Sequence, residues 1–163
     1  EDLTLKASVG YLDTEFETFC AQDPYQPSTT PDAGCPADKP QDLSGNELSD
    51  APKWSTSLLA QYNLQLDDLG QVLFSVQSSY RDDFYRRPQN LQIDKVDSYV
   101  LTDLRALWSS REGRYEVEFF VENLEDKDDI FLSSVTLSSP GMMSLLDHVP
   151  GRRYGAAFRM NFL

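Results

Sequence analysis

The chain has 163 residues, with 14 lysines and arginines against 27 aspartates and glutamates, so its formal net charge is −13. This acidic excess argues against binding to nucleic acid and against adhesion to anionic lipid head groups. Nine phenylalanines, eight tyrosines and two tryptophans argue against disorder of the whole chain. No run of apolar residues approaches the ~20 that a membrane-spanning helix needs.

The chain opens with a segment in which apolar and polar residues alternate, which is typical of a strand with one apolar face. Leu3, Leu5 and Val9 share one side of this segment, and the pattern continues in weaker form to Phe19. We therefore expect a first strand over residues 2–19. No basic and apolar leader precedes it, so for an exported protein we expect a mature or partial chain.

Residues 20–52 hold six of the nine prolines and show no sustained alternation. Such a connection is too long for a hairpin turn, so we expect a large loop. Cys20 and Cys35 are the only cysteines of the chain, and in an oxidising compartment we expect them to form a disulfide. Two free thiols in the loop are the alternative. His148, the only histidine, is far away in the sequence, which argues against a zinc site.

Alternating segments predict five further strands, and the connections between the strands differ sharply in length. Residues 67–70 (DDLG) and 111–114 (REGR) are short turns. The other connections are polar or irregular and much longer. The expected strands cover residues 53–66, 71–85, 98–110, 115–124 and 152–163, and the expected long loops cover residues 20–52, 86–97 and 125–149.

Long connections and short turns alternate along the chain, so in an antiparallel sheet all long loops lie at one end. Strands of about ten residues match the ~9–11 residues with which a tilted strand crosses a bilayer. Long outer loops opposite short periplasmic turns are the asymmetry of transmembrane barrels. The sequence therefore predicts an all-β fold, an antiparallel transmembrane β-barrel segment of about six strands. We expect it in the bacterial outer membrane, with extracellular long loops and a periplasmic C-terminus.

Each expected strand has an apolar and a polar side. The apolar sides are expected to meet lipid, with aromatic residues near both strand ends forming two girdles. These residues are Tyr11, Trp54, Tyr62, Tyr80, Trp108, Tyr115, Tyr154, Phe158 and Phe162. Three carboxylates in line on the fifth strand could not face a dry interior without partners, so the polar sides are expected to line a hydrated lumen. The predicted lumen residues are Arg81, Asp103, Arg105, Glu116, Glu118, Glu122 and Arg159.

Alternation alone leaves a soluble architecture open. In a β-sandwich or a lipocalin-like barrel the apolar sides point inward at one another, and the pattern along each strand is the same. Loop asymmetry, strand length and the placement of aromatic residues favour the membrane interpretation.

Four segments resemble motifs in the C-terminal part of the TonB-dependent outer-membrane receptors, and they occur in the order found in that family. The first is similar to a segment that precedes a barrel strand, and the last is similar to the closing strand. The segments are GNELSDAPKWS at residues 45–55, YVLTDLR at 99–105, FVENLEDK at 120–127 and PGRRYG at 150–155.

The resemblance implies the C-terminal part of a barrel of about 22 strands around a lumen that a plug domain closes. The first strand and residues 150–163 would then pair with strands outside this chain, since unpaired edges are very costly in hydrocarbon. The implied activity is TonB-dependent uptake of a scarce solute such as a ferric siderophore, cobalamin or a glycan. The implied partners are the remainder of the receptor, TonB acting through the plug, outer-membrane lipid and the transported solute, with no cofactor and no nucleic acid.

No constellation of residues suited to catalysis is visible, so we do not expect an enzyme. The acidic run at residues 125–129 could bind calcium, but its spacing matches no known calcium loop and we expect a solvated run. Ligand contacts would fall in the long loops, which contain Tyr25, Arg86, Arg87, Met142 and Met143. The lumen residues are expected to form a hydrated wall against the plug rather than a path for substrate. The alternatives are a small self-contained outer-membrane barrel with a structural or adhesive role, and a secreted β-sandwich binding module.

Overall fold

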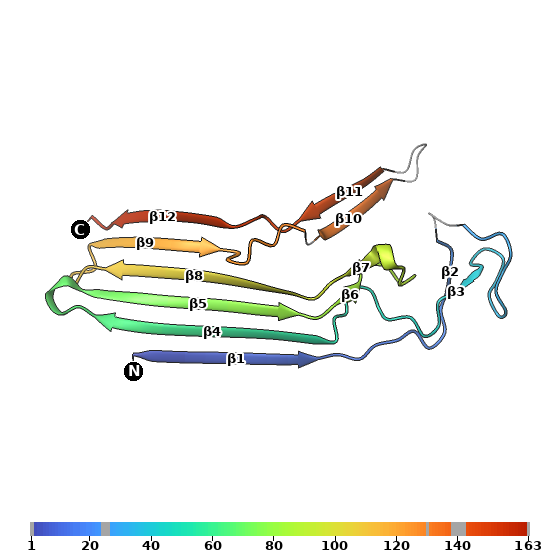
Figure 1. Cartoon of the computed structure of the whole chain (residues 1–163), viewed down its shortest axis with the longest axis horizontal. Helices are drawn as coiled ribbons and strands as arrows, with labels where there is room; N and C mark the ends of the chain where they lie inside the picture. The colour runs from blue at the N-terminus through green and yellow to red at the C-terminus, as the bar shows by residue number, and fades with distance from the viewer. Residues whose placement is uncertain (1, 24–26, 130, 138–142, 163) are drawn as a thin grey trace.

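The dominant feature of the computed structural model is an antiparallel sheet of six long strands (Figure 1). The structure describes residues 2–23, 27–129, 131–137 and 143–162. The long strands follow one another across the sheet in chain order, so the sheet is a meander. These strands are β1 (Leu3–Tyr11), β4 (Trp54–Gln65), β5 (Gln71–Arg81), β8 (Tyr99–Ser109), β9 (Tyr115–Glu122) and β12 (Arg153–Met160). The predicted all-β antiparallel architecture is confirmed.

The sheet is open. β1 forms one edge and β12 the other, and these two strands do not pair with each other (Figure 1). In the part of the chain that the structure describes, no further strand covers either edge. This topology excludes a barrel closed by these six strands, and it has the form of one section of a larger barrel.

Short turns join the long strands at one end of the sheet. The first contains the 3-10 helix η1 (Asp67–Leu69) and ends at Gly70, whose φ of 98° lies in the left-handed region that favours glycine. A Cβ at Gly70 would also collide with the backbone of Ser109. The second turn contains Gly113, with φ of 65°. The turn at position 70 therefore requires glycine, and the left-handed φ at position 113 favours it.

The long connections lie at the opposite end, and each contains a short two-stranded ladder (Figure 1). The prediction of an irregular third connection is therefore wrong in part, because two of its segments pair locally. The ladders are β2 (Cys20–Ala21) with β3 (Gln41–Asp42), β6 (Phe84–Tyr85) with β7 (Lys95–Val96), and β10 (Phe131–Leu137) with β11 (Met143–His148), and the 3-10 helix η2 (Gln92–Asp94) precedes β7.

Each long strand ends at least one residue before its predicted end, and two strands end markedly earlier. The first ends at Tyr11 rather than at residue 19, and Phe16 and Phe19 stack on each other with ring centroids 4.5 Å apart instead of continuing the ladder. The third predicted strand ends at Arg81 rather than at residue 85, because β6 pairs with β7. Both differences arise where a local contact replaces pairing within the large sheet.

Little of the described chain is buried. Among the described residues, twenty large apolar side chains are exposed, and fourteen of them lie on one face of the six long strands. The two packed sheets of a β-sandwich, the soluble alternative, are not present among the described residues. The same residues contain no helix with the length and apolar character needed to cross a membrane. Among the described residues, the buried apolar side chains lie in the loops or at the loop end of the sheet, and they include Pro40, Leu43, Phe84, Val96, Tyr99 and Val149.

Candidate functional site

The register of the sheet sorts its side chains onto two faces of opposite character. Residues paired across strands share a face, and along one strand every second residue lies on the same face. One row of paired residues is Tyr62, Phe74, Ala106 and Phe119. We call the face that carries this row, and every second residue from it along each strand, the apolar face. The residues between them form the polar face. The apolar face carries every predicted lipid-facing residue within the strands, and Phe162 follows β12 in the same alternation. These predicted residues are Tyr11, Trp54, Tyr62, Tyr80, Trp108, Tyr115, Tyr154, Phe158 and Phe162.

Aromatic residues contact one another at both ends of the apolar face. At the loop end Tyr11 packs against Trp54, with ring centroids 4.7 Å apart. At the turn end Tyr115 stacks on Phe158 at 6.3 Å. The indole N–H of Trp108 donates a hydrogen bond of 2.9 Å to a carbonyl oxygen of the turn between β4 and β5. Rings with an apolar body and a polar tip at both ends of a sheet suit the two interfaces of a bilayer.

The polar face carries all seven predicted lumen residues, and most of their charges are paired across strands. Arg105 contacts Glu118 at 3.1 Å and Glu122 at 3.4 Å, and Glu122 also pairs with Arg153 at 2.7 Å. Arg153 was not predicted, although it lies on the same side of its strand as the predicted residues. The seven residues are Arg81, Asp103, Arg105, Glu116, Glu118, Glu122 and Arg159.

A further ion pair joins Arg159 to Glu116 at 2.9 Å near the turn end of the polar face. The arginine and glutamate side chains thus alternate in sign across β8, β9 and β12. Because opposite charges face one another, this wall presents little net charge to whatever lies against it.

Phe120 is an aromatic residue on the polar face, and its ring lies over Gly155 of the neighbouring strand. A Cβ at position 155 would lie 2.5 Å from the ring edge, closer than carbon atoms can pack. Glycine at this position therefore lets the ring cover the β9–β12 ladder.

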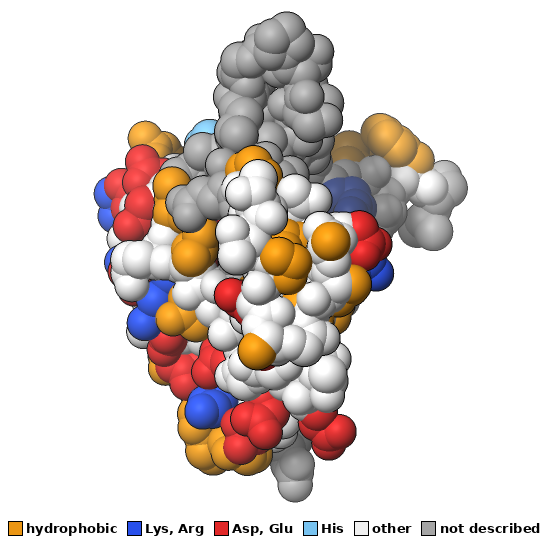
Figure 2. Space-filling model, turned by 90° about the vertical axis from the view of Figure 1, so that its right-hand side faces the viewer, with side chains coloured by type: hydrophobic (Ala, Val, Ile, Leu, Met, Phe, Trp, Pro, Cys, Tyr) orange, Lys and Arg blue, Asp and Glu red, His pale blue; other side chains and the backbone are white. Residues whose placement is uncertain are grey.

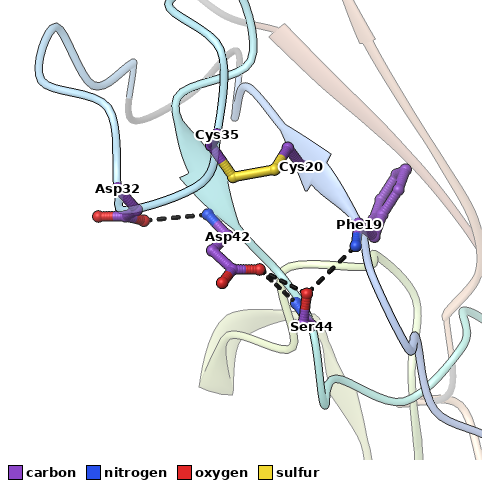
Figure 3. The surroundings of a disulfide bond; sticks show 6 residues. All are labelled: Phe19, Cys20, Asp32, Cys35, Asp42 and Ser44. Carbon is purple, nitrogen blue, oxygen red and sulfur yellow. Dashed lines mark hydrogen bonds between the residues drawn. A yellow bond between two sulfur atoms is a disulfide. The ribbon is translucent and has the colours of Figure 1, made fainter.

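The predicted disulfide between Cys20 and Cys35 is confirmed and lies beside the β2–β3 ladder (Figure 3). Asp42 of β3 accepts hydrogen bonds from the hydroxyl and backbone N–H of Ser44, at 2.6 and 3.0 Å, and these bonds lower the pKa of Asp42. Ser44 Oγ in turn accepts a hydrogen bond from the N–H of Phe19 at 3.2 Å (Figure 3). An Asp42 oxygen lies within 4.8 Å of both sulfurs, but a disulfide offers no thiolate to a metal.

Arg87 joins the first and second long loops through two buried carboxylates. Its Nε donates to Asp94 Oδ1 at 2.6 Å, and its Nη1 lies 3.3 Å from Asp23 Oδ1. The side chains of Asp23 and Asp94 are only 1% and 9% exposed. Removing one partner of a buried ion pair is strongly destabilising, so this cluster holds the two loops together. Nothing in the proline-rich sequence around Asp23 indicated this role.

The motif at residues 45–55 adds a second set of contacts between the same loops. Asn46 Nδ2 donates to the carbonyl oxygen of Pro88 at 2.9 Å. Asn90 Oδ1 accepts from the N–H of Glu47 at 2.7 Å, and Asn90 Nδ2 donates to the carbonyl oxygen of Glu47 at 3.1 Å. The first and second long loops therefore pack as one body.

The other three motifs meet at the loop-side ends of β8, β9 and β12. Asn123 is 6% exposed, and its Nδ2 donates to the carbonyl oxygens of Lys127 and Pro150, at 2.8 and 2.9 Å. Its Oδ1 accepts from the N–H of Lys127 at 3.0 Å, and its own N–H donates to Asp103 Oδ1 at 2.9 Å. One asparagine thus ties the start of the third long loop to its end.

The first carboxylates of the acidic run have partners within the protein. Glu125 Oε2 accepts a hydrogen bond from the N–H of Thr102 at 2.8 Å. Burial raises the pKa of Glu125, but hydrogen bonds with Thr102 and its own backbone together bring it below its usual value. Asp126 Oδ1 accepts from the N–H of Arg152 at 2.8 Å. Among the described residues, the acidic run does not bring three carboxylate, imidazole or thiol groups within ligand distance of one another.

The loop end carries an excess of acidic residues, and in Figure 2, which looks onto this end, acidic side chains lie at several places with basic side chains between them. Residues 12–53, 82–98 and 123–152 contain 18 acidic and 7 basic residues, so they carry −11 of the net charge of −13. Of the loop residues considered as ligand contacts, Tyr25 and Met142 lie outside the described residues. A field of this sign attracts cations to the loop end and disfavours anions there.

An open sheet of membrane-spanning strand length, apolar on one face and polar on the other, defines a section of an outer-membrane β-barrel. The family model described as TonB dependent receptor-like, beta-barrel matches residues 2–124. The chain therefore belongs to the TonB-dependent receptor family, whose members reside in the bacterial outer membrane.

Two solved structures are similar to this chain, each with a TM-score of 0.61. The ferric yersiniabactin uptake receptor FyuA from Yersinia pestis is 17% identical, over 74% of this chain and 18% of that receptor. The siderophore receptor PiuA from Acinetobacter baumannii is 20% identical, over 97% of this chain and 19% of that receptor. At these identities the similarity shows the fold alone, and the chain spans about a fifth of each receptor. No curated protein sequence matches the chain significantly.

Proposed function

We propose that this chain is the C-terminal part of the barrel of an outer-membrane receptor that takes up a scarce solute by TonB-dependent transport. The observation that carries the proposal is the open sheet with one apolar and one polar face, in a chain that belongs to the TonB-dependent receptor family. Coverage of only 18% and 19% of the two similar receptors supports a barrel completed by strands outside this chain. In that barrel β12 would pair with the first strand.

In the proposed orientation the apolar face meets lipid and the polar face meets the lumen. Monomeric soluble proteins avoid apolar patches as large as the one formed by fourteen exposed side chains on one face. Lipid would cover this patch, and the aromatic residues at both strand ends would lie at the two interfaces. The long loops would be extracellular, and the short turns and the end of β12 periplasmic.

The polar face would form the hydrated wall against which a plug domain rests. Its charges are largely paired, as between Arg105 and Glu118, which supports a passive wall over a charged path for substrate. TonB would act through the plug, so transport would be mechanical and this chain would carry out no bond chemistry and need no cofactor.

A ferric siderophore is the first solute class to test, because one of the similar structures is a ferric yersiniabactin uptake receptor and the other is a siderophore receptor. Cobalamin and a glycan are the alternatives. The acidic loop end disfavours a strongly anionic solute at this part of the mouth.

The membrane part of the proposal is tested by extraction. The protein should remain in the outer-membrane fraction and require detergent for release, because its apolar face is too large to be stable in water. A monomer that stays soluble without detergent would contradict the proposal.

The transport part is tested by uptake of radiolabelled iron bound to a panel of siderophores, into iron-limited cells that contain the receptor. Uptake should saturate, should require TonB and should be lost when residues 153–160 are deleted. Uptake that continues without TonB would contradict the proposed mechanism, whereas failure of every ferric complex would direct the search to cobalamin and glycans.

A further inference from the structure

The apolar face is hollowed near its centre. A depression of about 680 Å³ lies over β5, β8, β9 and β12. It is open on the side that faces away from the sheet, and the side chains that line it from the apolar face carry no charge. These are Phe74, Val76, Leu104, Ala106, Phe119, Val121, Tyr154 and Ala156.

The depression follows from one row of the register. In this row Phe74, Ala106, Phe119 and Ala156 lie side by side on successive strands, so phenylalanine alternates with alanine. Each alanine side chain ends at Cβ and leaves a gap beside its larger neighbours. Phe119 and Tyr154 are 60% and 82% exposed and stand out from the sheet around these gaps.

The floor of the depression is backbone. The remaining lining residues have side chains that belong to the polar face, so they contribute main-chain atoms from below. They are Ser75, Arg105, Phe120 and Gly155. Over β5, β8 and β9 the main-chain polar groups are engaged in ladders on both sides, so this part of the depression offers a ligand shape and apolar surface but few free hydrogen-bond partners.

We infer that this depression is a binding site for an acyl chain of a membrane lipid, an inference that rests on the proposed orientation of the apolar face toward lipid. A cavity of about 680 Å³ falls within the ~300–1,000 Å³ typical of ligand sites. A polar ligand would lose its hydrogen bonds to water in so apolar a site. An acyl chain is apolar and flexible and already borders this face in the proposed membrane.

Packing is the physical reason why an acyl chain would prefer the depression to the rest of the apolar face. An unfilled void beside Phe119 forfeits dispersion contacts on one side, and a flexible chain restores them. Because bilayer lipid is as apolar as the site, no hydrophobic driving force separates bound from bulk lipid. Packing alone therefore favours lipid at this site, and the bound lipid exchanges with bulk lipid rather than forming an irreversible complex. A second protein would need a ridge complementary to the protruding Phe119 and Tyr154, whereas a lipid chain adapts to them.

The site is tested by photocrosslinking of the purified protein, reconstituted into vesicles that contain phosphatidylethanolamine with a diazirine on one acyl chain. Adducts are mapped by peptide mass spectrometry after illumination. Adducts on Phe119, Val121 and Tyr154 should exceed those on Leu5 and Leu58 several-fold. Leu5 and Leu58 lie on the same apolar face but outside the depression.

Filling the depression provides the matched comparison. The double substitution Ala106→Phe and Ala156→Phe should reduce adducts on Phe119 and Tyr154 several-fold. Ala60→Phe places the same ring on the apolar face of β4, beside Val76 but not among the lining residues, and should leave the adducts on Phe119 and Tyr154 unchanged.

The outcomes separate this inference from the proposed function. Absence of adducts from the whole apolar face, Leu5 included, would overturn both. Adducts spread evenly over the face in the unsubstituted protein would overturn the lipid site but leave the lipid-facing orientation intact, and this comparison needs no variant to fold. Adducts concentrated at the depression that survive its filling would also overturn the site.

Discussion

The sheet and the loop end of this protein are held together in different ways. Of the six long strands, only Tyr99 is buried, so the sheet depends on its ladder and on whatever covers its apolar face. The loop end has a small core of Phe84, Val96, Tyr99 and Val149, together with a disulfide and buried ion pairs. The loop end is therefore stabilised by contacts within the protein, whereas the stability of the sheet depends on the medium that covers its apolar face.

The largest effect is expected from breaking the ion cluster of the loop end. Arg87→Ala removes the cation that the buried carboxylates of Asp23 and Asp94 share, and such a loss costs about 3–5 kcal/mol in comparable sites. Hydrogen exchange of residues 12–53 and 82–98 should accelerate, while the exchange of the sheet stays unchanged.

The control for this prediction is Arg111→Ala. Arg111 pairs with Asp68 in a solvent-exposed position, where such pairs contribute about 0–1 kcal/mol. Equal protection of the loops in both variants would show that the cluster around Arg87 does not hold them together.

The second effect concerns the environment of the sheet. Val76→Arg places a charge on the apolar face near mid-sheet and should cost about 2–4 kcal/mol if that face meets hydrocarbon. Gln77→Arg, one residue along on the polar face, should stay within about 0.5 kcal/mol. Urea unfolding in lipid vesicles, followed by tryptophan fluorescence, measures both. Equal costs for the two variants would contradict the assignment of the faces.

A third, smaller effect is expected where the sheet meets the third long loop. Asn123→Ala removes three hydrogen bonds from a buried side chain, and unsatisfied buried groups cost about 1–3 kcal/mol. Asn161→Ala removes a single exposed hydrogen bond to Gly113 and serves as the control. Proteolysis near residues 123–130 should rise only in the first variant, and equal rates in both would show that Asn123 is not the tie between the ends of this loop.

The sheet was largely predictable because the face of a strand residue is a local property. Tyr115–Glu122 shows its strand directly in the alternation of apolar residues with glutamates, and Gly70 and Gly113 mark the two tight turns. The connections were less predictable, because β6, β10 and β11 form by pairing with nearby segments that carry no period of two.

Contacts between segments that are distant in the sequence could not be predicted from it. Asp23 and Arg87 are 64 residues apart, and no local pattern indicates that they meet. The depression on the apolar face likewise exists only because the register places Ala106 and Ala156 on either side of Phe119. Within its own strand, neither Ala106 nor Ala156 stands at an unusual position.

The smallest effect should come from pH, and it should act on the loop end. Lys95 Nζ lies 2.9 Å from Asp83 Oδ2, and the hydrogen bond from Lys95 lowers the pKa of Asp83 below its ordinary 3.8, while the same bond raises the pKa of Lys95 above 10.5. Since the folded-state pKa of Asp83 is lowered, its contribution is present above pH 3.8 and is lost as the pH falls below that value. The contribution of Lys95 is present below pH 10.5 and is lost as the pH rises above it.

Between these limits the link between β6 and β7 should not depend on pH, and below pH 3.8 proteolysis of residues 82–98 should accelerate. Asp42 and Glu125 also have lowered pKa values and titrate in the same acidic range, so acid alone does not identify the responsible pair. The substitution Asp83→Asn isolates the contribution of the Asp83–Lys95 pair. In this variant the proteolysis of residues 82–98 should already be faster at neutral pH and should increase less in acid. If the variant had the same acid profile as the unsubstituted protein, Asp83 would not contribute to the stability of the loop end. The ion cluster and the disulfide would then account for that stability.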